Sequence, residues 1–156
     1  MSGRIAPPKE LETALDRFTT AEVQGGLPLF ETKQKALMFA AASLGRRRGK
    51  REPLDRKGVA IRYEIFERTL DEGFIDALAI ATTGDLKVLA PDRADERVLI
   101  FEEYAYAGLL EMVERCFNRS GDSMEELLAI ADELREGSSE GLDGMDPGVL
   151  RKLMGE

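Results

Sequence analysis

The strongest constraint on the fold is a stripe of apolar residues between Pro91 and Asn118. Its members follow one another at intervals of three or four positions: Val98, Phe101, Ala105, Leu109, Met112 and Cys116. One face of an α-helix repeats at these intervals, so the pattern predicts a single long helix from about Pro91 to Asn118. The segment RVLIF near its start would also suit a strand, but the continuing helical period favours a helix. Other helices must cover such a stripe.

Four further helices are predicted, each from an apolar period with a start or stop signal. Proline suits a first helical turn, so one helix begins at Pro7 or Pro8 and ends near Phe18. A second, KQKALMFAAASL at 33–44, follows the N-cap residue Thr32 and is expected to stop at Gly45 in a left-handed conformation. Its alanines should let a neighbouring helix approach closely.

The other two helices are each introduced by a capping box, in which a side chain and an acid three residues later satisfy backbone donors. Thr69 and Glu72 form the first, ahead of a helix that closes at Gly84. Asp122 and Glu125 form the second, ahead of a final helix. The sequence therefore predicts a mainly α fold with a compact domain of about five helices.

One segment, residues 59–66, shows the alternation of a strand. Val59, Ile61, Tyr63 and Ile65 alternate with the residues between them, and β-branched side chains are frequent. At most one short β element is therefore expected, with LKVL at 86–89 as a weak candidate partner. Because a lone strand is unstable, it must pack on helices or pair with another copy.

The chain length predicts one domain. A chain of 156 residues can bury about two thirds of its unfolded surface in one core. We assign residues 1–136 to a single helical domain and 137–156 to a flexible acidic tail, because SSEGLDGMDPG interrupts every period. Pro147 could start a short terminal helix.

The composition excludes several classes of catalyst. The chain contains no histidine, which excludes serine–histidine and cysteine–histidine catalysis. Its one cysteine, Cys116, lies on the apolar stripe and is expected to be an inert core thiol. Neither a P-loop nor a GxGxxG motif is present. We expect a protein without enzymatic activity and with no cofactor or bound metal.

One cluster of carboxylates is a candidate metal site. Asp95, Glu96, Glu102 and Glu103 could hold a hard divalent cation. The alternative is a solvated helix face whose first acids are favoured by the helix dipole.

The sequence also predicts where the protein resides. No run of eighteen apolar residues and no signal peptide is present, so no membrane association is expected. A single cysteine fits the reducing cytoplasm.

Charge is concentrated in one segment. The chain has a net charge of −8, yet seven basic residues lie between positions 46 and 57: Arg46, Arg47, Arg48, Lys50, Arg51, Arg56 and Lys57. One interpretation is a loop that contacts phosphates or an acidic partner. The other is a solvated helix end, since cations favour that pole of a helix. With five cations among the six residues 46–51, we predict that this segment binds nucleic acid or a partner.

Several segments resemble a known family. They are TKQKALMFAAASLG (32–45), REPLD (51–55), IRYEIFE (61–67), ALAIATTGD (77–85) and RVLIFEEYAYAGL (97–109). In order and spacing the chain resembles small proteins associated with bacterial DNA phosphorothioation (dnd) systems, the type called phosphorothioation-associated protein four. It carries Ala107-Gly108 where the family pattern has Gly-Gly.

The resemblance implies a role beside genes that place sulfur in the DNA backbone or restrict DNA lacking it, which are anti-phage functions. The leading hypothesis is an accessory protein that contacts DNA, or a DNA-bound complex of the same defence system, through the basic segment. The alternative is an acidic module whose C-terminal half docks on a basic effector subunit and regulates it. The resemblance implies no catalytic residues.

Overall fold

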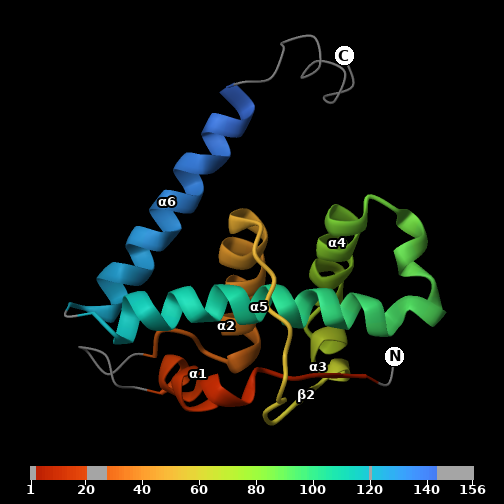
Figure 1. Cartoon of the computed structure of the whole chain (residues 1–156), viewed down its shortest axis with the longest axis horizontal. Helices are drawn as coiled ribbons and strands as arrows, with labels where there is room; N and C mark the ends of the chain where they lie inside the picture. Colours follow the sequence, from red (N-terminus) through yellow and green to blue (C-terminus); the bar gives the residue numbers. More distant parts are fainter. Residues whose placement is uncertain (1–2, 21–27, 120, 144–156) are drawn as a thin grey trace.

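Helices dominate the structure, a computed structural model that describes residues 3–20, 28–119 and 121–143 (Figure 1), and the predicted mainly α fold is confirmed. The helices are α1 (Glu12–Thr19), α2 (Lys33–Phe39), α3 (Tyr63–Arg68), α4 (Glu72–Thr83), α5 (Ala94–Phe117) and α6 (Ser123–Asp143). The strands β1 (Arg4–Ile5) and β2 (Ile61–Arg62) form one small sheet. Shorter helical segments are η1 (Lys9–Leu11), η2 (Ala40–Arg46), η3 (Leu86–Leu89) and η4 (Pro91–Arg93).

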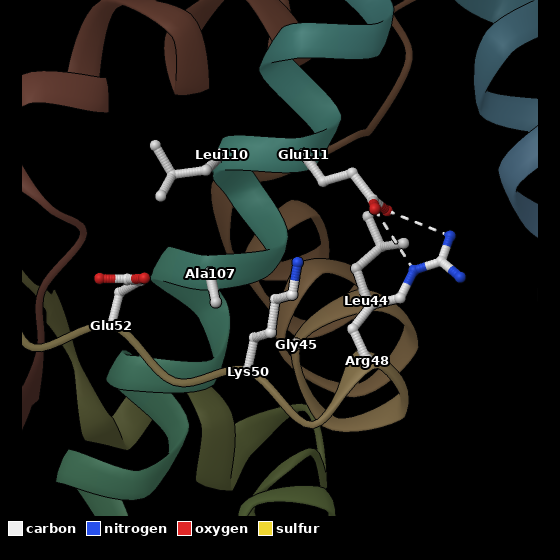
Figure 2. A pocket seen from close by; sticks show the side chains of 8 residues that line it. All are labelled: Leu44, Gly45, Arg48, Lys50, Glu52, Ala107, Leu110 and Glu111. Carbon is white, nitrogen blue, oxygen red and sulfur yellow. Dashed lines mark hydrogen bonds and ion pairs between the residues drawn. The ribbon is translucent and has the colours of Figure 1, made fainter.

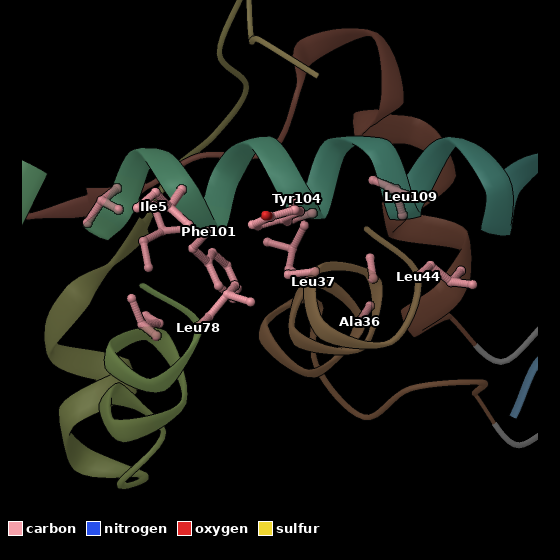
Figure 3. Packing of buried hydrophobic residues seen from close by; sticks show 14 of the residues in the cluster. Ile5, Ala36, Leu37, Leu44, Leu78, Phe101, Tyr104 and Leu109 are labelled. Atoms are coloured by element: carbon pink, nitrogen blue, oxygen red, sulfur yellow. The ribbon is translucent and has the colours of Figure 1, made fainter. Parts of the chain in front are cut away.

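The predicted long helix is confirmed as α5, which runs across the middle of the molecule (Figure 1). The proline-containing segment η4 leads into it. Figure 3 shows α5 lying across α2 and α4, with Phe101 close to Leu78 and with Leu37 next to Tyr104. Phe101 is fully buried, and it makes an edge-on contact with the ring of Phe66. The core therefore lies between α5 and the elements that cross it.

Two glycines permit the close crossing of α5 with η2. A Cβ at Gly45 would lie 2.1 Å from the carbonyl oxygen of Tyr104, and one at Gly108 would lie 1.9 Å from that of Ala40. The predicted close approach at the alanine run is confirmed. The prediction that Gly45 stops the helix is wrong, because η2 continues to Arg46 as a π-helix. The left-handed residue that follows is Gly49, with φ of 65°.

The predicted strand at 59–66 is wrong in extent and in partner. Only Ile61 and Arg62 form β2, and α3 begins directly at Tyr63. Tyr63 and Phe66 are both buried with stacked rings, and their separation of three positions is helical, so burial of the aromatic pair overrides the alternation. The partner of β2 is β1, antiparallel, while residues 86–89 form a 3-10 helix.

The start of α4 also differs from its prediction. Its N-cap residue is Asp71, and Thr69 does not cap it. Instead the Thr69 hydroxyl donates to Asp71 Oδ2 at 2.7 Å, and Gln34 Nε2 donates to the same oxygen at 2.6 Å. The predicted end is confirmed, because Gly84 adopts φ of 67° after the last turn.

The last helix begins as predicted and continues further. Asp122 Oδ1 accepts from the backbone N–H groups of Met124 and Glu125. The helix then reaches Asp143, so the predicted linker after Gly137 is wrong over its first residues. In Figure 1, α6 starts beside the C-terminal end of α5 and extends away from the other helices. The division at 136/137 stays a prediction, and the predicted terminal helix lies outside the described residues.

Candidate partner-binding site

The basic segment leaves the C-terminal end of η2 and passes along α5. Its first cation, Arg46, donates from Nη2 to the carbonyl oxygen of Ala81 at 3.3 Å. That carbonyl belongs to the last turn of α4, where free carbonyl groups attract positive charge. Arg46 thus joins two helices of the domain. Arg47, the next residue, is exposed at the end of η2.

Two further arginines bind carboxylates of the protein itself. Arg48 forms ion pairs at 3.3 Å with Glu111 of α5 and Glu133 of α6. Arg51 pairs with Glu103 of α5 at 3.1 Å. These side chains are partly exposed, so the bonds fix their positions more than they stabilise the fold. Arg48 and Arg51 are nevertheless already paired with carboxylates of the protein itself.

The last cation, Lys57, is bound to an almost fully buried carboxylate. Its Nζ lies 3.1 Å from Oε1 of Glu102, whose side chain is 1% exposed. The other oxygen of Glu102 accepts from the backbone N–H of Ala6 at 2.8 Å. A buried carboxylate needs such partners. Glu102 therefore fastens β1 and the end of the basic segment to α5.

Two of the seven cations remain without a partner among the described residues. The side chains of Lys50 and Arg56 are exposed and form no hydrogen bond or ion pair there. The structure thus divides the basic segment into cations held by the fold and the pair Lys50 and Arg56.

A pocket of about 300 Å³ opens beside Lys50 (Figure 2). Its lining comes from η2, the basic segment and α5: Leu44, Gly45, Arg48, Lys50, Glu52, Ala107, Leu110 and Glu111. In Figure 2 the Lys50 chain runs up beside Ala107, between Glu52 on one side and Arg48 on the other. Apolar carbon therefore lies next to the Lys50 ammonium group, for which residues 3–20, 28–119 and 121–143 provide no partner.

The rim of this pocket carries one ion pair and two further charged side chains of opposite sign. Arg48 and Glu111 satisfy each other, as the dashed lines in Figure 2 show. Lys50 and the Glu52 carboxylate have no partner among the described residues. The Leu110 side chain is 41% exposed, so its apolar surface borders the pocket. The pocket can therefore take an apolar group flanked by charge.

Glu133 connects this site to α6. Hydrogen bonds from Arg115 and, to a smaller extent, from Arg48 hold the pKa of Glu133 below its usual value. Arg115 also binds Glu126 at 3.1 Å. The alternative prediction, an acidic C-terminal half that docks on a basic partner, is not tested by these contacts, although they show that two of its acids are already occupied.

The carboxylates of the candidate metal site do not form a common site. Glu102 and Glu103 bind cations of the basic segment, and Glu96 binds Arg93 at 2.7 Å. Within the described ranges, no three acidic or cysteine residues are grouped so that they could hold a metal ion. Cys116 is buried, which raises the pKa of its thiol to about 11. The thiol stays protonated near neutral pH and is a weak nucleophile.

Sequence reasoning missed the acids that bind the basic segment. A signal was present, because Glu103 and Glu111 are eight positions apart, which places them on one face of the predicted long helix. Nothing in the sequence indicated that this face would meet residues 48–51. The pocket was missed for the same reason, since its residues come from distant positions.

The family follows from the sequence as a whole. The model of a family described as DNA sulphur modification system-associated protein 4 matches residues 4–145. The chain belongs to this family. The match confirms the resemblance drawn from residues 32–109 and extends it toward both ends. It associates the protein with a DNA sulphur modification system, and the description names no reaction.

Other comparisons add nothing to this identification. Neither a curated protein nor a solved structure matches the chain significantly. Within the part of the chain that the structure describes, every helix is too short or too polar to cross a membrane. The role within the system must therefore be argued from the site.

Proposed function

We propose that this protein is a non-catalytic accessory component of its DNA sulphur modification system and binds another protein of that system at the pocket beside Lys50. The observation that carries the proposal is the Lys50 ammonium group, unpaired within the described part of the chain, next to exposed apolar carbon of Leu110. Protein interfaces combine a buried apolar anchor with charged groups at the rim. The proposal assigns no chemistry, because the sequence offers no histidine as a base.

The pocket suggests the chemistry of the partner. Small-ligand sites occupy about 300–1,000 Å³, so this one is at the small end and suits one or two side chains better than a nucleotide. An apolar side chain would contact Leu44, Ala107 and Leu110, and a neighbouring carboxylate would reach Lys50. The rigid crossing of η2 and α5 supports the floor, which keeps the ordering cost of binding low.

Protein binding is favoured over DNA binding at this segment because most of its cations are engaged. A phosphate would have to displace Glu111 or Glu133 from Arg48 and Glu103 from Arg51. Binding to DNA gains from releasing counterions that cations replace, and cations already paired with acids contribute less. The prediction that residues 46–51 contact DNA therefore stays a prediction.

Co-purification tests the proposal. The tagged full-length chain is co-expressed with the other proteins of its modification system and isolated at about 150 mM salt, near physiological ionic strength. The parent should retain one of them. The double variant Lys50→Glu and Leu110→Glu should lose it, because both the cation and the apolar contact are removed.

Leu128→Glu provides the matched control. Leu128 lies on α6 and is 58% exposed, so this variant also replaces an exposed leucine by a charge, away from the pocket. It should retain the partner. The proposal is abandoned if the parent retains none of the system's proteins, or if both variants lose the partner equally while circular dichroism shows both folded.

A further inference from the structure

The paired segments 4–9 and 56–62 form a ribbon that carries three cations outside the basic segment, Arg4, Lys9 and Arg62. Beyond β1 and β2 the pairing continues, because Pro8 bridges to Lys57 and Lys9 N–H donates to the Arg56 carbonyl at 3.0 Å. Lys57 on these stretches is bound to Glu102, and four further exposed cations have no partner among the described residues. We call these four the cationic ribbon: Arg4, Lys9, Arg56 and Arg62. Of these, sequence reasoning had identified Arg56 alone.

Arg4 and Arg62 face each other across the strands. They are direct partners in the antiparallel register, and residues directly opposite each other in such a pair share one face of the sheet. The next pair, Ile5 and Ile61, lies on the opposite face, where Ile5 is fully buried. Both arginines are exposed on the outer face. Like charges in this position destabilise a sheet.

No acid of the described chain compensates this repulsion. The side chains of Arg4 and Arg62 form no hydrogen bond or ion pair with a described residue. Several arginines elsewhere in the fold are paired with carboxylates, for example Arg93 with Glu96 and Arg115 with Glu133. An unpaired couple of opposed arginines therefore indicates an anionic ligand.

The second couple lies at the other end of the ribbon. The side chains of Lys9 and Arg56 are exposed and likewise have no partner among the described residues. Five residues of extended chain span roughly 17 Å, which separates Arg4 from Lys9 along the ribbon. One DNA strand places a phosphate about every 3.4 Å along the helix axis, so the ribbon is about as long as five successive phosphates.

Four acids lie on or beside the same segments, and none of them forms an ion pair with the four cations. Glu10 accepts a hydrogen bond from the Tyr106 hydroxyl, and Glu12 accepts one from the backbone N–H of Val59. Asp55 and Glu64 are exposed on the same segments and pair with none of the four cations. These acids equal the four cations in number, and Glu10 and Asp55 adjoin Lys9 and Arg56 in the chain, so the excess of positive charge lies at the Arg4–Arg62 couple.

We propose that the cationic ribbon binds the phosphate backbone of double-stranded DNA without reading its sequence. Guanidinium groups bind phosphate oxygens in pairs of parallel hydrogen bonds, and phosphate contacts orient a protein on DNA without specifying bases. The opposed guanidinium groups of Arg4 and Arg62 share one exposed face and can each bind a phosphate of the same DNA strand. This inference goes beyond the pocket and gives the protein a second binding surface.

The test measures binding of the full-length chain to a fluorescently labelled 24-base-pair duplex between about 50 and 200 mM salt, the range over which phosphate contacts weaken steeply. Arg4→Gln with Arg62→Gln should weaken binding at least about tenfold at the lower salt. It should also reduce the slope of log K against log salt by about 2, because each phosphate contact contributes about 0.9.

The matched control is Lys87→Gln with Arg119→Gln, which removes two exposed charges elsewhere. It should leave affinity within about twofold, since these cations do not lie on the ribbon. Arg4→Glu separates binding from folding, because it places an acid opposite Arg62. This variant should melt at the same temperature as the parent or higher, yet bind DNA more weakly.

Three results would overturn the inference. One is a parent that shows no binding at the lower salt. Another is an equal loss in the ribbon and control variants. The third is binding of polyglutamate as tight as binding of DNA, which would make the ribbon a surface for acidic proteins. The pocket variant Lys50→Glu with Leu110→Glu distinguishes the two surfaces, because loss of its partner protein leaves the Arg4 and Arg62 contribution to DNA binding intact.

Discussion

Gly108 of α5 lies against the carbonyl oxygen of Ala40 so closely that any Cβ at this position would overlap that oxygen. The same crossing brings Gly45 against the carbonyl of Tyr104. The two helices therefore touch backbone to backbone, where Cα–H groups lie near carbonyl oxygens. The residue before this glycine, Ala107, instead lines the pocket, so the Ala107-Gly108 step places one residue at the crossing and one at the site.

Replacing Gly108 by alanine should destabilise the fold by about 1–3 kcal/mol, because the methyl group forces the helices apart. Gly45→Ala should behave similarly. Gly73→Ala is the control, since nothing lies within 4 Å of a Cβ there and alanine favours a helix by up to about 1 kcal/mol. Urea unfolding measures all three, and a Gly108→Ala protein as stable as the parent would contradict the crossing.

Removing the buried carboxylate of Glu102 should loosen the N-terminal strand. In Glu102→Ala the Ala6 N–H and the Lys57 ammonium both lose their acceptor, which should cost about 1–3 kcal/mol for the unsatisfied donor. Glu102→Gln keeps an oxygen for Ala6 and should lose less. Hydrogen exchange of the Ala6 amide checks the cause, and unchanged protection in the alanine variant would refute it.

The turn before α4 should contribute pH-dependent stability. Hydrogen bonds from Thr69 and then from Lys35 hold the pKa of Asp71 below the ordinary value of 3.8 for an aspartate. A lowered folded-state pKa stabilises above the unfolded value, and this contribution is lost as pH falls through 3.8 toward the folded value. Melting temperatures from pH 6 to pH 3 should therefore fall more in the parent than in Asp71→Asn. Parallel curves would show that Asp71 contributes nothing.

Arg115 should hold the first turns of α6 on α5. Its guanidinium binds Glu126 at 3.1 Å and Glu133 at 2.8 Å, so Arg115→Gln removes bonds to two turns of α6. Amides of residues 126–133 should then exchange faster, by about tenfold if roughly 1.4 kcal/mol is lost. Arg119→Gln, which breaks a longer and more exposed pair with Glu114, should change little. Equal exchange in both variants would contradict this role.

Local signals in the sequence predicted helix ends correctly where a nearby residue forms the hydrogen bond or adopts the conformation that ends the helix. Thr32 caps α2 by accepting from Lys35 N–H, Asp122 caps α6, and Gly84 closes α4 in the left-handed conformation. Each depends on residues at most four positions apart. Thr69 failed as a cap because its hydroxyl and Asp71 are bound to each other, with Gln34 from a distant helix joining them.

The candidate site was predictable only as a list of cations. The basic character of residues 46–57 can be read from the sequence. Their partners cannot, because these lie 45 or more positions away along the chain: Glu102, Glu103, Glu111 and Glu133. The pairing of Arg4 with Arg62 is equally invisible, because it depends on which segment β2 meets.

The sequence by itself determined the helical class, the long central helix and the family, because helical periodicity and family motifs are patterns along one chain. The tertiary structure alone decided which cations are neutralised and which remain free. Electrostatic energy depends on distance in space, and only folding brings a carboxylate of α5 within 3.1 Å of Arg51 while leaving Arg62 beside another arginine.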